Sequence, residues 1–152
     1  MKNLYVYLFF ISGFSFGQII NIPDPVFKAL LLGAGTTNTI AGQLIIDGNN
    51  NYEIEQSEAL LVFGLVLPPG NIQSLTGIEY FTNLYSLTCH SNLISSADLS
   101  NSPLLEGLHI SNNQLTSLIL TGLTNLQYVF CGGNPLTEVD FSTLTSLQTA
   151  YC

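Results

Sequence analysis

The chain of 152 residues has few charged side chains, and almost none of them are basic. Charged residues make up 8% of the sequence, with two lysines (Lys2 and Lys28), no arginine and ten acidic residues, so the formal net charge is −8. Without a cluster of basic side chains the chain cannot neutralise phosphate groups, which argues against nucleic acid and an anionic membrane surface as partners. Hydrophobic residues account for 47% of the chain, enough for the continuous core of one domain.

The sequence also lacks the residue patterns that catalysis requires. Its two histidines, His90 and His109, belong to no Ser-His-Asp order, and the chain contains no nucleophile elbow or phosphate-binding loop. A zinc site would need a third ligand beside the two histidines, and the sequence offers none. We therefore expect that the protein is not an enzyme.

The longest apolar run lies at the N-terminus and extends from Leu4 to Phe16. Ser15 and Gly17 occupy the −3 and −1 positions of a cleavage site before Gln18, a layout typical of a secretory signal peptide. The run is shorter than the ~20 residues that a spanning helix needs, and no cysteine follows the cleavage site to carry a lipid. We predict a signal peptide over residues 1–17 and a secreted or cell-surface protein. The alternative is a buried core helix.

The second half of the chain is built on a repeat of 21 residues. Four columns of residues return at this interval: Leu84, Leu105, Leu126 and Leu147; Leu87, Leu108, Val129 and Ala150; Cys89, Ile110, Cys131 and Cys152; and Asn92, Asn113 and Asn134. Each unit reads L-x-x-L-x-[LIC]-x-x-N-x-[LI], and a longer unit precedes them, with 22 residues from Val62 to Leu84. The pattern resembles the leucine-rich-repeat family, whose period is roughly 20–29 residues.

The spacing has a physical reason if each unit makes one turn of a coil. Alternate side chains of L-x-x-L-x-L point inward from a short strand, and the inward asparagine bonds the buried backbone of the following turn. Successive turns stack at about 4.8 Å, and a unit of 21 residues leaves little room for an outer helix. We predict an α/β solenoid. It is a right-handed leucine-rich-repeat coil with short parallel strands on the concave face, 3₁₀ or extended segments on the convex side, and a small N-terminal helical cap.

The segment before the repeats is predicted to form that cap, over residues 18–60. A solenoid end exposes apolar edges that a cap must cover. Asp24 as N-cap, Pro25 at the first helical position and Gly33 as terminator predict a short helix. The leucine-rich repeats are then expected over residues 61–152.

The cap contains a segment that resembles the twelve-residue calcium loop of EF-hand and dockerin modules. The candidate ligands are Asp47, Asn49, Asn51, Glu53 (through its carbonyl), Glu55 and Glu58. Tyr52 replaces the glycine usual at position 6 and must therefore adopt a positive φ. The preceding segment, Gln43–Ile46, favours a strand rather than a helix. The alternative is an asparagine-rich turn followed by a helix whose first turn is acidic.

Three segments together resemble the internalin-like secreted proteins of Gram-negative gliding bacteria. These are "IPD…FKALL", the candidate calcium loop with its "EIEQSEA", and "SLTGIEYFTNL". The resemblance implies that the repeats precede a C-terminal sorting domain. Because the sequence stops at Cys152, inside the strand of a repeat, we expect it to be a truncated product or a fragment.

Three cysteines in an exported protein raise the question of disulfides. Cys89, Cys131 and Cys152 share one inward column. Cys89 and Cys131 are two turns apart, too far to bridge, whereas Cys131 and Cys152 lie in adjacent turns where a bond is geometrically possible. We favour buried free thiols that fill the core.

The outward positions of the predicted strands form the candidate ligand-binding surface. It comprises His90, His109, Tyr128, Phe130 and Tyr151, and large apolar groups that face solvent are typical of partner surfaces. We predict a recognition or adhesion protein whose concave strand face binds another protein. One alternative is a passive spacer, or the N-terminal part of a larger surface protein whose missing C-terminal module carries the function. The other is a glycan-binding module built on Tyr128, Phe130 and Tyr151.

Overall fold

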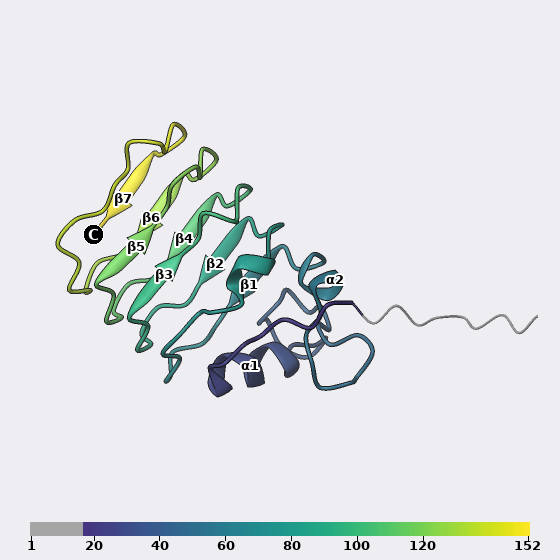
Figure 1. Ribbon diagram of the computed structural model, residues 1–152. Coiled ribbons are helices and arrows are strands. Elements are labelled where there is room, and N and C mark those ends of the chain that lie inside the picture. The colour runs from purple at the N-terminus through teal and green to yellow at the C-terminus, as the bar shows by residue number, and fades with distance from the viewer. Residues whose placement is uncertain (1–16) are drawn as a thin grey trace, which may run out of the picture.

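The computed structural model describes residues 17–152, which wind into a solenoid of parallel strands (Figure 1). The larger sheet is parallel and has the order β1-β2-β4-β6-β7. Its strands are β1 (Gly64–Val66), β2 (Ser86–Thr88), β4 (Gly107–His109), β6 (Tyr128–Phe130) and β7 (Thr149–Tyr151). The predicted leucine-rich-repeat solenoid is confirmed. The predicted signal peptide, apart from Gly17, lies outside the described residues.

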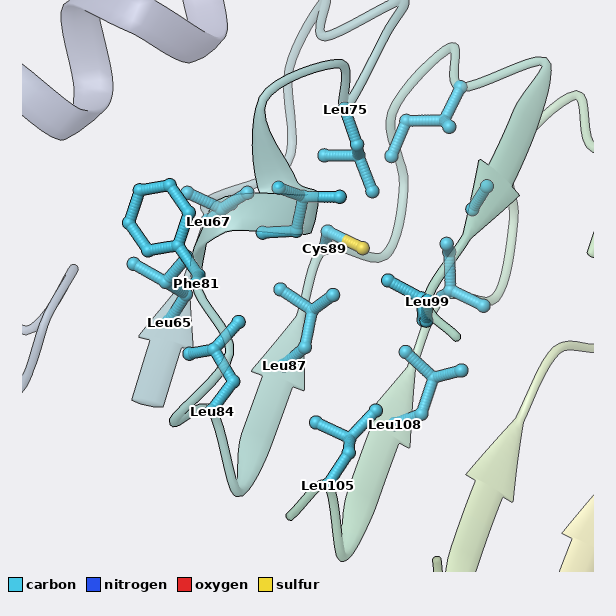
Figure 2. Close-up of a cluster of buried hydrophobic side chains, with 14 of the residues drawn as sticks. Leu65, Leu67, Leu75, Phe81, Leu84, Leu87, Cys89, Leu99, Leu105 and Leu108 are labelled. Carbon is cyan, nitrogen blue, oxygen red and sulfur yellow. The ribbon is translucent and has the colours of Figure 1, made fainter. Parts of the chain in front are cut away.

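Each strand pairs with the equivalent residues of the next repeat. Leu87 faces Leu108, Leu108 faces Val129, and Val129 faces Ala150. Because one repeat makes one turn, every inward column stacks on itself and the leucines line a single interior. Leu87 and Leu108 are almost completely buried, and Figure 2 shows them with Cys89 and neighbouring leucines between the strands and the opposite wall of the coil.

A second sheet of two parallel strands, β3 (Ser96–Asp98) and β5 (Ser117–Ile119), lies on the other side of the coil (Figure 1). We predicted extended segments here but not their pairing. Ala97 and Leu118 are both buried and face each other in register. The segments therefore pair because the 21-residue period keeps their inward residues aligned.

Asparagine side chains bond the turns that follow the strands. The Asn113 amide donates to the carbonyls of Cys89 (3.1 Å), Ile110 (3.0 Å) and Ser111 (3.2 Å), and its oxygen accepts from the amide of Ile94 (3.1 Å). The equivalent residues of the neighbouring turns, Asn92 and Asn134, make similar bonds. These side chains satisfy backbone groups that would otherwise be buried without partners.

The cap is joined to the first coil by a buried carboxylate. Helix α1 (Pro25–Leu32) begins after Asp24 and ends at Gly33, as the sequence predicted. One Asp24 oxygen accepts from the amides of Val26 and Phe27, both at 2.9 Å, and the other accepts from Gln73 (2.7 Å) and Ser74 (3.0 Å). Asp24 therefore caps the helix and also holds it against the first repeat.

The remaining helical elements are short. They are α2 (Gln56–Ala59) and the 3₁₀ helix η1 (Ile78–Tyr80). The strand predicted over Gln43–Ile46 is wrong, since this segment forms turns and bends. Gly42 and Gln43 have φ angles of +61° and +70°, which a continuous strand does not allow. Between residues 17 and 152, no helix is long and apolar enough to cross a membrane.

Candidate functional site

The outward residues of the five-stranded sheet form two rows, which we call the strand face. In each strand the middle residue points to the core, so the first and third residues point outward. The rows are Gly64, Ser86, Gly107, Tyr128 and Thr149, and Val66, Thr88, His109, Phe130 and Tyr151. Neither row contains an acidic residue, a lysine or an arginine. The strand face is therefore polar to aromatic and carries no formal charge at neutral pH.

Four rings stack along one side of the strand face, and we call them the ring ladder. His90 and His109 have ring centroids 4.6 Å apart with an interplanar angle of 27°. His109 and Phe130 pack edge to face, with ring centroids 5.6 Å apart and an interplanar angle of 62°. Phe130 stacks on Tyr151, with ring centroids 5.7 Å apart and an interplanar angle of 10°. Such spacings are those of favourable aromatic pairs. The four rings therefore form one continuous row of contacts across β4, β6 and β7 and the residue that follows β2 by two positions.

Tyr128 lies in the neighbouring row, beside a shallow hollow. Its side chain is 42% exposed, and its hydroxyl donates to Oε1 of Gln148 at 3.2 Å. Gly107 contributes no side chain between Ser86 and Tyr128, which leaves a depression of about 200 Å³ bounded also by His109 and Phe130. Of the five predicted surface residues, the structure thus joins four in the ring ladder and places Tyr128 next to it.

The environment of the ladder keeps His109 neutral. Burial, and then the positive charge that His90 would carry, lower the pKa of His109 below its ordinary value of 6.5. The two imidazoles are stacked without an acidic partner in either row. The surroundings of His109 therefore favour its neutral imidazole.

The sequence analysis missed an exposed apolar cluster beside β1. Leu61, Phe63, Val66 and Tyr85 line a groove of about 580 Å³ together with the loop formed by residues 39–44. Part of this cluster could have been predicted from the sequence. Phe63 and Tyr85 occupy the same position of the repeat, where later units have glutamate or glutamine. The loop that completes the groove follows no repeat and gave no such signal.

The candidate calcium loop has a left-handed backbone conformation at its sixth position. Tyr52 adopts a φ of +64°, as predicted for the position that is usually glycine. The Asp47 carboxylate accepts from the amides of Asn51 and Tyr52, both at 3.1 Å, and Glu58 Oε1 accepts from the amide of Gly48 at 2.8 Å. Asp47 and Glu58, the first and last candidate ligands, therefore both accept hydrogen bonds from backbone amides of the same loop.

The other candidate ligands are engaged in hydrogen bonds or an ion pair. The amides of Asn51 and Asn49 donate to the two oxygens of Glu55, at 2.6 and 3.1 Å. Glu53 forms an ion pair with Lys28 at 2.6 Å between Oε2 and Nζ. In the described part of the chain, no group of three or more His, Cys, Asp or Glu side chains is arranged to hold a metal. The loop is closed by its own bonds, and calcium binding stays a prediction.

The end of the loop contains two neighbouring carboxylates. A hydrogen bond from Glu58 lowers the pKa of Glu55, and the asparagine amides lower it further. Burial and the proximity of Glu55 raise the pKa of Glu58 above its ordinary value. The two glutamates therefore ionise unequally, with the negative charge favoured on Glu55.

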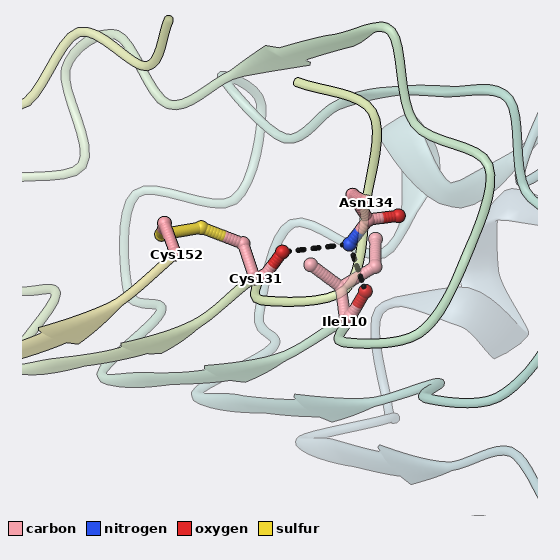
Figure 3. The surroundings of a disulfide bond; sticks show 4 residues. All are labelled: Ile110, Cys131, Asn134 and Cys152. Carbon is pink, nitrogen blue, oxygen red and sulfur yellow. Dashed lines mark hydrogen bonds between the residues drawn. A yellow bond between two sulfur atoms is a disulfide. The ribbon is translucent and has the colours of Figure 1, made fainter. Parts of the chain in front are cut away.

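The cysteine column contains one disulfide. Cys131 and Cys152 are bonded, with Cα atoms 4.5 Å apart, and Figure 3 shows the bond near Asn134, which donates to the carbonyls of Cys131 and Ile110. The prediction of free thiols is wrong for this pair, because in-register stacking brings their Cα atoms within disulfide range. It is confirmed for Cys89, whose burial raises its thiol pKa to about 12.

Comparisons with known proteins agree with this architecture. A family model described as leucine-rich repeats (2 copies) matches residues 103–146. The internalin inlF from Listeria monocytogenes matches at 25% identity with a TM-score of 0.66, over 83% of this chain and 35% of that chain. The functional domain of InlJ from Listeria monocytogenes, which includes a cysteine ladder, matches at 30% identity with a TM-score of 0.71, over 89% of this chain and 28% of that chain.

The present chain thus spans about a third or less of the length of these two solved chains. A search of the curated proteins gives no significant match. The similarity covers the cap and the repeats of this chain, since most of its residues are aligned.

Proposed function

Because this chain is an internalin-like leucine-rich-repeat protein, we propose that it is a non-enzymatic recognition or adhesion protein whose strand face binds a protein partner. The observation that carries the proposal is the ring ladder with the adjacent Tyr128. These side chains form a continuous and partly exposed aromatic strip on the parallel sheet. Aromatic side chains with a polar tip are the residues that most often anchor protein interfaces.

The stacking of the rings favours a protein over a glycan. A sugar that stacks on an aromatic side chain needs an open ring face, but Phe130 stacks on Tyr151 and contacts His109 on its other side. The exposed tyrosines Tyr128 and Tyr151 combine an apolar ring with a hydroxyl, which suits a protein surface that supplies carbonyl oxygens and apolar side chains. Glycan binding and a passive spacer remain the competing proposals.

The test is to remove the aromatic strip and measure binding. Surface-protein fractions are captured on the immobilised chain, bound proteins are identified by mass spectrometry, and the dissociation constants of purified candidates are measured. Replacing Tyr128, Phe130 and Tyr151 with alanine should weaken a specific partner by at least about 30-fold, the effect of losing hot-spot residues. Ile119→Ala is the matched control, because Ile119 is exposed on the other sheet. Unchanged binding of the triple variant rejects the recognition proposal in favour of a spacer, and a positive glycan array with no protein partner favours the glycan.

Export to the cell surface or medium is part of the same proposal. It is supported by the signal-peptide pattern at the N-terminus. Expression in a bacterial host with mass analysis of the secreted product checks it, and the expected mature N-terminus is Gln18. Retention of the intact chain inside the cell contradicts it.

We also propose that the loop from Asp47 to Glu58 binds calcium weakly. The supporting observation is the pair of adjacent carboxylates, Glu55 and Glu58, connected to Asp47 through the loop backbone. Carboxylate oxygens suit a hard cation, and a cation would offset the repulsion between Glu55 and Glu58, which adds to burial in raising the pKa of Glu58. Calcium would have to displace the asparagine amides that now donate to Glu55, which is why we expect weak affinity.

Thermal unfolding with calcium and with a chelator tests the loop. If the dissociation constant is about 1 mM, a calcium concentration of about 10 mM should stabilise the chain by about 1.4 kcal/mol. Glu58→Gln should remove this response, whereas Glu138→Gln, a matched change far from the loop in sequence, should keep it. An identical Tm of the unmodified chain in calcium and in chelator would show that the loop is purely structural.

A further inference from the structure

We propose that the groove beside β1 is a second docking site, which takes an apolar anchor side chain from a basic segment of a partner protein. We call it the β1 groove. It lies between the loop of residues 39–44 and the start of the sheet, and it measures about 580 Å³. This site goes beyond the strand-face proposal, because its main apolar side chains, Leu61, Phe63 and Tyr85, lie outside the two rows of the strand face. Gly64, Val66 and Ser86 belong to both surfaces.

The side chains of the β1 groove are large, apolar and about half exposed. Leu61 is 58% exposed, Phe63 56%, Tyr85 52% and Val66 46%. Exposed apolar residues are common singly, but four that line one hollow form the kind of patch that marks an interaction site. Nothing in residues 17–152 covers these side chains further.

Both walls of the β1 groove are held by hydrogen bonds. The amide of Val66 donates to the carbonyl of Ile40 at 2.8 Å, which fixes the loop against the strand. On the other wall, the Asn83 side chain donates to the carbonyl of Leu60 at 2.7 Å, and the amide of Tyr85 donates to the carbonyl of Phe63 at 2.8 Å. A groove with fixed walls binds without ordering a loop, so little of the binding energy is lost.

Charge complementarity identifies the partner as basic. The groove lining contains no charged residue, but Glu58 precedes Leu61 by three residues and Glu106 is hydrogen-bonded through its amide to the carbonyl of Tyr85. Lys28 is the only basic residue between 17 and 152, and Glu53 already pairs with it. With ten acidic residues against one lysine, residues 17–152 carry a net negative charge, which favours a segment with lysine or arginine beside its apolar anchor. A second copy of this chain would bring ten more acidic residues and is disfavoured.

Three synthetic peptides of equal length test the proposal on the complete chain. One has a Leu-Phe anchor flanked by lysines, one has the same anchor flanked by glutamates, and one has the lysines with serines in place of the anchor. Amide chemical shifts report which residues respond, and titration gives the dissociation constants. We expect the first peptide to bind at least about tenfold more tightly than the other two. The shifts should centre on Leu61, Phe63 and Tyr85, and added salt should weaken binding.

Variants of exposed groove residues supply the second arm. Phe63→Ser should weaken the lysine peptide about tenfold. Leu61→Lys should shift the preference toward the glutamate peptide, and this reversal remains readable if Phe63→Ser loses stability. Ile119→Ser is the control, because Ile119 is exposed on the other sheet, outside both proposed sites, and it should leave peptide binding unchanged. Failure of the strand-face proposal would appear as unchanged partner binding in the triple aromatic variant, whereas failure of this proposal would appear in the peptide titrations of the Leu61 and Phe63 variants.

Three results would overturn the proposal. The first is equal binding of the three peptides. The second is the absence of shifts at the groove residues with peptide in the millimolar range. The third is a concentration-dependent dimer that Phe63→Ser abolishes and the lysine peptide does not compete with, which would identify a second copy as the occupant.

Discussion

Among single residues, Asn113 shows most directly how one side chain supports the coil. It is buried, and its amide nitrogen serves three carbonyl oxygens while its own oxygen accepts one backbone amide. Asn113→Asp keeps the acceptor but replaces the donor with an oxygen that faces three other oxygens. We expect the free energy of unfolding to fall by about 3 kcal/mol, measured by urea denaturation.

The neighbouring exposed residue provides the control for Asn113. Gln114→Ala should change the free energy of unfolding by less than about 0.5 kcal/mol, because the Gln114 side chain is exposed and its backbone amide, which bonds Ile94 of the preceding turn, is kept. If the two variants were equally stable, the asparagine column would have no structural role.

Asp24 makes the stability of the cap depend on pH. Burial raises the pKa of its carboxyl, but four backbone amide bonds together outweigh burial and hold the pKa below its ordinary value of 3.8. A lowered folded-state pKa stabilises the protein above about pH 4, and this contribution is lost as the pH falls through the folded value. Asp24→Asn should lower the free energy of unfolding by about 2 kcal/mol at pH 7, since its amide would face the Gln73 and Ser74 donors.

Measuring Asp24→Asn at low pH tests the direction of this pH dependence of stability. Below the folded-state pKa the carboxyl of the unmodified chain is protonated, so the difference between the two proteins should shrink. A constant difference from pH 7 to pH 2 would contradict a role for the charge. The N-cap role of Asp24 was predictable from its local sequence, whereas its bonds to Gln73 and Ser74 were not, because those residues are 49 and 50 positions away.

At the level of elements, β2 and β4 bring two histidines into contact. Because burial and the nearby His90 lower the pKa of His109, we expect its imidazole resonances to titrate below the ordinary value of about 6.5. His90→Gln should move the His109 titration back toward that value. The folded state then binds fewer protons than the unfolded state, so this residue reduces stability as the pH falls below about 6.5. Unaltered titration of His109 in the variant would show that the stacked pair is not electrostatically coupled.

The disulfide between the end of β6 and the end of β7 holds the last described turn to its neighbour. It closes a loop with a sequence separation of 21 residues. Reduction should lower the free energy of unfolding by about 3 kcal/mol, as expected for a loop of this size, and amide exchange should accelerate first in β7. Cys89→Ser provides the comparison, since that thiol is free and buried. Equal exchange in β7 before and after reduction would mean that its hydrogen bonds to β6 suffice.

For the whole molecule, the 21-residue repeat determines which features could be predicted from the sequence. Leu105 and Leu108 recur with their equivalents every 21 residues, so the coil, its inward columns and the outward aromatic rows all follow from one spacing. The β1 groove was not predictable, because the contact between Ile40 and Val66 depends on how a non-repeating loop folds back. The sequence showed that a Cys131–Cys152 bond was possible but did not establish it, since adjacent positions in one column allow either a disulfide or two buried thiols.

In-register pairing also has a consequence for how such a chain changes over generations. From β2 to β7, each strand pairs with the strands of the adjacent repeats at the same offset of residues. Recombination that duplicates or deletes one whole unit therefore leaves every remaining junction intact and lengthens or shortens the sheet by about 4.8 Å. The reach of the aromatic strip can thus be adjusted in fixed steps, while the cap and its groove are inherited unaltered.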